Sequence, residues 1–142
     1  MKKLTALVLA LCMALGLAAC GGSKDTGSAA GSTAAASGDT VKIGVYEPQS
    51  GDNGAGGKQE ILGIQYANSV APTVEIGGKT YNVKLEIVDN ESSNDKAVSA
   101  ASQLVSKGVS VVLGSYGSGV SIAASDTFKN AGVPAIGVTC TN

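Results

Sequence analysis

The 142-residue sequence contains no histidine, no tryptophan and no arginine, because all ten of its basic residues are lysines. Histidine is the side chain that most readily exchanges protons near neutral pH, and it is the most common metal ligand. Arginine is the side chain that holds carboxylates and phosphates at two points. We therefore expect no metal site, no cofactor and no acid–base catalysis. Any bound anion should be held by backbone N–H groups, hydroxyls or lysine.

Positive charge is also scarce. The formal net charge is -1 at pH 7 and the isoelectric point is near 5.3. Such a chain has no basic field that would attract nucleic acid. We therefore expect no nucleic-acid partner.

Cysteines are few and irregularly spaced. Cys12, Cys20 and Cys140 form no CxxC pair, so the sequence indicates neither a disulfide framework nor a zinc site. A catalytic role for Cys140 would require a neighbouring base to form the thiolate, and the sequence shows none. We interpret Cys140 as a small buried residue near the end of a strand.

Residues 1–19 have the order of a secretion signal, with Lys2 and Lys3 first, then an apolar run, then small residues. The stretch "LAAC", which ends at Cys20, resembles the lipobox of bacterial lipoproteins, in which the cysteine is lipidated and begins the mature chain. We therefore predict a signal peptide over 1–19, lipidation of Cys20 and an extracytoplasmic protein anchored to the membrane by acyl chains. The alternative is an ordinary signal peptide followed by a cysteine.

Residues 20–40 contain the lipidated cysteine and a tract of glycine, serine, alanine and threonine without periodicity. This composition predicts a flexible tether. The composition changes at Val41, where we expect the folded region, 41–142, to begin.

Strand-like and helix-like patterns alternate after Val41. Strands are expected over 41–46, 83–88, 109–114 and 133–138, with Gly77 and Gly78 forming a hairpin turn before the second of them. Helices are expected over 58–71, from the capping candidates at 92–95 to Gly108, and over 119–131 up to Gly132. This alternation predicts an α/β fold, a parallel sheet flanked by helices.

Ligands of such sheets bind beyond the carboxyl ends of the strands. The glycine-rich segment "SGDNGAGGKQ", 50–59, fits neither a Walker A loop nor a dinucleotide-binding pattern, and we expect a mobile loop there. The segment "GSYGSG", 114–119, adds hydroxyls and leads into a helix whose free N–H groups favour an anion. Ser118 in this segment is either a carboxylate ligand or a helix cap.

Four segments also carry a family resemblance in the same order along the chain. They are "IGVYEPQSGDNGAGG", "DNESSNDKAV", "VVLGSYGSG" and "AGVPAIGVTCTN". Together they make Val41–Asn142 similar to the N-terminal lobe of the leucine/isoleucine/valine-binding protein family, the type I periplasmic binding proteins of ABC importers. The resemblance implies a non-enzymatic protein that binds an amino acid or similar small polar solute and presents it to an ABC transporter permease.

The resemblance also implies a role for three residues. Ser118 would bind the α-carboxylate of the ligand through its hydroxyl and its backbone N–H. The backbone carbonyl of Thr139 would accept from the ligand ammonium, and Thr141 would contact both groups. Gly56 stands where some family members place an aromatic residue over the ligand.

The family's ligand site lies between two lobes, whereas this sequence stops just after its fourth expected strand. We therefore expect a truncated N-terminal lobe without the second lobe. Two other functions remain open, a ligand-binding sensor that signals to a receptor partner and a hydrolase with Ser118 or Cys140 as nucleophile.

Overall fold

The computed structural model describes residues 39–141, so the predicted signal peptide, Cys20 and nearly all of the predicted tether lie outside the described residues. Its elements in chain order are β1 (Thr40–Glu47), α2 (Gly54–Val70), β2 (Thr73–Ile76), β3 (Lys79–Asp89), α3 (Asn94–Ser106), β4 (Val111–Leu113), α4 (Ser118–Asn130) and β5 (Ala135–Ile136). No helix among these combines the length and the apolar character needed to cross a membrane.

The five strands form one sheet in the order β2-β3-β1-β4-β5. The β1–β3, β1–β4 and β4–β5 pairs are parallel, and only β2 runs antiparallel, against β3. Gly77 and Gly78 make the β2–β3 turn with positive φ angles of 60° and 78°, a conformation that favours glycine. The predicted hairpin and the predicted α/β sheet are therefore confirmed, with one antiparallel strand at the edge.

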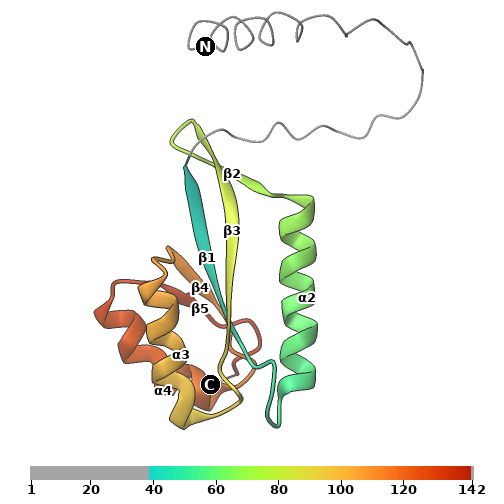
Figure 1. The fold of residues 1–142 in the computed structure, drawn as a ribbon, viewed down its shortest axis with the longest axis vertical. Coiled ribbons are helices and arrows are strands. Elements are labelled where there is room, and N and C mark those ends of the chain that lie inside the picture. The colour runs from blue at the N-terminus through green and yellow to red at the C-terminus, as the bar shows by residue number, and fades with distance from the viewer. Residues whose placement is uncertain (1–38, 142) are drawn as a thin grey trace, which may run out of the picture. The chain divides into compact units, whose positions relative to one another are not determined.

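Helices cover both faces of the sheet, as Figure 1 shows, with α2 on one face and α3 and α4 together on the other. The α3/α4 face holds the main core. Tyr46 of β1 lies at its centre, where its hydroxyl donates to the carbonyls of Ala97 and Val120 and its ring meets Phe128 edge-on with centroids 5.6 Å apart. Leu104 of α3 is fully buried in the same cluster.

On the other face of the sheet, α2 buries few side chains. Among the apolar residues of this helix, Ile61 is buried, whereas Leu62, Tyr66 and Val70 are 64%, 72% and 65% exposed. The helix is held close to the sheet by its glycines instead. Gly57 lies directly against the backbone of Pro48, where a Cβ would have no room.

Several predicted boundaries were wrong. The first strand, β1, begins at Thr40 and not at Val41. Helix α2 begins at Gly54, inside the segment 50–59 that was expected to be a mobile loop. The expected strand 109–114 is reduced to Val111–Leu113. The last expected strand, 133–138, is reduced to Ala135–Ile136, the two residues that pair with β4. The ends of α3 and α4 near Gly108 and Gly132 were predicted correctly.

Candidate functional site

The candidate site lies at the carboxyl edge of the parallel strands. The segments that follow β1, β3, β4 and β5 all leave the sheet at this edge, because those four strands run in one direction. Three of these segments lead into α2, α3 and α4, and the fourth is 137–141. The site is therefore made from residues far apart in the sequence.

Ser118 is the first residue of α4. The N-cap position belongs to Gly117, and no side chain caps the helix, so the capping interpretation of Ser118 was wrong. Its hydroxyl oxygen accepts a hydrogen bond from the backbone N–H of Thr141 at 3.2 Å. The structure thus brings together two of the three predicted site residues, which stand 23 positions apart in the sequence.

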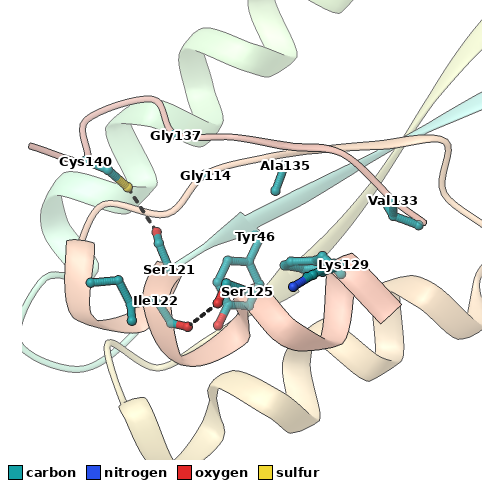
Figure 2. Close-up of a pocket in the computed structure, with 11 residues that line it drawn as sticks. Tyr46, Gly114, Ser121, Ile122, Ser125, Lys129, Val133, Ala135, Gly137 and Cys140 are labelled. Carbon is teal, nitrogen blue, oxygen red and sulfur yellow. Dashed lines mark hydrogen bonds between the residues drawn. The ribbon is translucent and has the colours of Figure 1, made fainter. Parts of the chain in front are cut away.

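Cys140 fixes the segment that carries the two threonines. Its thiol donates to the carbonyl of Ser115 at 3.1 Å and lies 3.0 Å from the hydroxyl of Ser121, a contact visible in Figure 2. Thr139 and Thr141, on either side of it, are exposed. Cys140 is half-buried just beyond β5, close to the expected location, and it anchors the segment to α4.

Asp89, the last residue of β3, joins two loops of the site. Its carboxylate accepts from the backbone N–H groups of Gln49 and Glu91, both at 2.8 Å, and from the hydroxyl of Ser50 at 2.7 Å. Burial alone would raise the pKa of Asp89, but these hydrogen bonds to the ionised form lower it. Ser92 completes the junction by accepting from the backbone N–H of Asn53 at 3.0 Å.

Glu47, the last residue of β1, holds the β4–α4 loop. It is completely buried, and its Oε2 accepts from the backbone N–H of Tyr116 at 2.7 Å. Asn90, also completely buried, donates to the hydroxyl of Ser115 at 3.1 Å in the same loop. The sequence patterns did not identify either residue, since the signal is only a polar side chain at or just after the end of a buried strand.

Tyr116 contributes an aromatic ring beside the site. The ring lies so close to Gly56 that a Cβ on the glycine would be 2.6 Å from two of its carbons. Gly56, in the first turn of α2, stands where an aromatic residue could have lain, and a ring from the β4–α4 loop occupies the adjoining space instead. It is 40% exposed and stands two residues before Ser118.

A cavity of about 400 Å³ lies beside the strand tips, between α4 and β5 (Figure 2). Its walls are largely apolar and include Tyr46, Phe128, Val133 and Ala135, with Lys129 as the one charged lining residue. Ser118 and Thr141 do not line the cavity, but Ser121 and Cys140, which anchor the segment that carries Thr141, do. No group of three or more potential metal ligands is found within residues 39–141.

Comparisons with known proteins agree with this architecture. A family model described as "Periplasmic binding protein" matches residues 40–142. The Leu/Ile/Val-binding protein homolog 2 of Brucella abortus (strain 2308) is 33% identical over 103 residues, which cover 72% of this chain and 27% of that protein.

Two solved structures are similar as well. The branched-chain amino acid transporter substrate-binding protein LivJ from Streptococcus pneumoniae, in complex with isoleucine, matches with a TM-score of 0.64 and 33% identity over 73% of this chain and 30% of that chain. The leucine-binding protein LivK from Thermotoga maritima matches with a TM-score of 0.66 and 31% identity over 72% and 29%. The chain spans less than a third of the length of these relatives.

Proposed function

The chain belongs to the periplasmic binding protein family, and from this premise we propose that it is part of an extracytoplasmic solute-binding protein that delivers amino acids to an ABC importer. Branched-chain amino acids are the first ligands to consider, because the named relatives are leucine-, isoleucine- or valine-binding proteins. We propose no catalytic activity. The thiol of Cys140 is engaged with Ser115 and Ser121, and the chain has no histidine to activate Ser118.

The contact between Ser118 and Thr141 carries the proposal for the ligand site. It places a hydroxyl and the N-terminus of α4 beside the exposed segment that follows β5. Free N–H groups at a helix N-terminus favour a carboxylate even where no arginine is present. In the proposed site, Ser118 binds the ligand carboxylate, the Thr139 carbonyl accepts from the ammonium, and Thr141 contacts both.

Calorimetry on the protein at its full native length, with a panel of amino acids and their amides, tests this site. A hydrogen bond to a charged group is worth about 1.5–3 kcal/mol, so Ser118→Ala should weaken binding by roughly tenfold or more. Ser125→Ala is the matched control, since Ser125 lies on the same helix with its hydroxyl bonded to the carbonyl of Ile122. If no amino acid binds the native protein, the proposed function is wrong.

We also propose that residues 1–19 are a lipoprotein signal peptide. In this proposal the lipidated Cys20 and the tether through residue 40 hold the protein at the membrane, and residues 41–142 form the ligand-binding lobe. An extracytoplasmic location agrees with the family. Cys20→Ser should release the protein from the membrane fraction into the periplasm or the medium. Retention of this variant in washed membranes would contradict lipid anchoring.

A further inference from the structure

Two carboxyl groups with oxygen atoms that are buried and unpartnered within residues 39–141, those of Glu47 and Glu60, interact with each other next to the β4–α4 loop of the candidate site. Glu47 ends β1, and Glu60 lies on α2, which covers that face of the sheet. The salt bridges seen between residues 39 and 141 join lysines to Asp39 and Glu86 and do not include either residue. The two carboxyls are therefore not neutralised by lysine.

Their oxygen atoms are also short of hydrogen bonds. Glu47 Oε1 and both carboxyl oxygens of Glu60 are buried and have no partner among the described residues. The backbone of Gly114 closes over Glu47, since a Cβ at Gly114 would lie 2.5 Å from Oε1. An ionised carboxylate only accepts hydrogen bonds, so two ionised groups here could not satisfy each other.

One proton resolves both problems. If a single proton lies between Glu47 Oε1 and an oxygen of Glu60, one carboxyl becomes a donor to the other and the like-charge repulsion disappears. Glu47 Oε2 stays available to accept from the backbone N–H of Tyr116. The other acid nearby, Asp89, is the register partner of Glu47 on β3, and its carboxylate is occupied by loop donors.

We propose that Glu47 and Glu60 share one proton as a buried carboxyl–carboxylate pair, and that this pair positions the backbone of Tyr116 and hence the Ser118 segment of the candidate site. Glu47 and Glu60 are thus positioning residues, since neither is placed in contact with the ligand. The existence of the proton-sharing pair does not depend on the proposed function, whereas its expected effect on ligand affinity rests on the proposed function.

An NMR titration of the Tyr116 backbone amide from pH 5 to 9 tests the pair, using the protein at its full native length. Burial, and then the Glu60 carboxyl, raises the pKa of Glu47 to about 8, so the amide signal should shift with a midpoint near that pH. Glu47→Gln should abolish the shift while keeping an acceptor for the Tyr116 N–H. Glu60→Gln should move the midpoint down, and Glu75→Gln, an exposed position on β2, should change nothing.

Ligand affinity provides the second measurement. Deprotonation of the pair adds a negative charge near the place proposed for the ligand carboxylate, so affinity should fall about two- to tenfold between pH 7 and pH 9. In Glu47→Gln this decline should disappear, with binding retained at pH 7. A structural role without a shared proton would not produce this pH profile or its rescue.

Three results would overturn the pair. They are a Tyr116 amide that does not titrate between pH 5 and 9, a midpoint unchanged by Glu47→Gln and Glu60→Gln, and a signal that follows potassium or calcium concentration at fixed pH. The last result would mean that a cation, not a proton, lies between the carboxyls. If the amide titrates as expected but no amino acid binds at any pH, only the proposed function fails.

Discussion

Two glycines of α2 should respond in opposite ways to the same substitution. Gly63 lies on an open part of the helix, where an added Cβ would meet no atom within 4 Å. Gly57 lies six positions earlier, where an added Cβ would be 2.1 Å from the carbonyl oxygen of Pro48 and 2.7 Å from its ring. Alanine at the two positions therefore separates helix propensity from the packing of α2 against β1.

The magnitudes follow from these surroundings. Gly63→Ala should stabilise the fold by about 0.5–1 kcal/mol, because glycine in a helix interior loses more backbone entropy than alanine. Gly57→Ala should destabilise it by about 1–3 kcal/mol, the usual cost of overpacking, since Pro48 is itself fully buried and cannot move aside freely. The free energies of unfolding of the two variants should differ by about 1.5–4 kcal/mol.

Denaturant and thermal unfolding monitored by circular dichroism would measure this difference. For a domain of this size, 1 kcal/mol corresponds to a shift in Tm of roughly 4–8 °C, so opposite signs are easily resolved. A Gly57→Ala variant as stable as the native protein would refute the close contact between α2 and Pro48. A destabilised Gly63→Ala variant would show that Gly63 is covered by something in solution.

Three further outcomes are expected. Leu104→Ala should lower the free energy of unfolding by about 2–5 kcal/mol in the same assay, because Leu104 is fully buried in the α3/α4 core, whereas Val98→Ala on the exposed side of α3 should cost much less. If the exposed ring of Tyr116 contacts the ligand side chain, Tyr116→Ala should weaken calorimetric binding of leucine more than that of alanine, and Tyr116→Phe should preserve the binding of both. An equal loss of affinity for the two ligands would indicate that Tyr116 only positions the loop. Because the pKa of Asp89 is lowered in the fold, its ionised form stabilises the fold above the pKa of an unfolded aspartate, and this contribution disappears as the pH falls. Asp89→Asn should therefore flatten the acid side of a stability–pH profile. An unchanged profile would contradict the role of Asp89 in joining the loops.

The alternating apolar patterns were sufficient to predict the main strands and the three helices, and Gly77 and Gly78 were sufficient to predict the hairpin, because each of these elements depends on residues close together in the sequence. The start of α2 was missed for a physical reason. Glycine is a poor helix former, so the run from Gly54 to Gly57 favours a loop by propensity. The close approach of Pro48 nevertheless leaves no room for a larger residue at Gly57, and Gln49 leaves little room at Gly54. Tertiary packing therefore overrides the local preference.

The candidate site also combines features that the sequence indicates with features that only the fold reveals. Ser118, Thr139 and Thr141 were identified through a family resemblance, and the contact between Ser118 and Thr141 is a distance between residues that no local pattern contains. The glycine at position 56 indicated only that no aromatic residue stands there. The sequence does not reveal that the ring of Tyr116 lies against Gly56.

The acids at the ends of the strands explain how separate loops become one site. Glu47 and Asp89 are register partners on β1 and β3, and both lie where an apolar strand pattern would predict another apolar residue or a turn. Glu47 holds the β4–α4 loop and Asp89 holds the β1–α2 loop, so each acid fixes a segment that does not follow its own strand. A carboxyl group shielded from water is costly when it lacks hydrogen-bond partners, so movement of either loop would leave Glu47 or Asp89 without a partner. The loop geometry is therefore set by the ends of the strands, and residues such as Tyr116 can differ in side chain while the backbone that presents Ser118 stays in place.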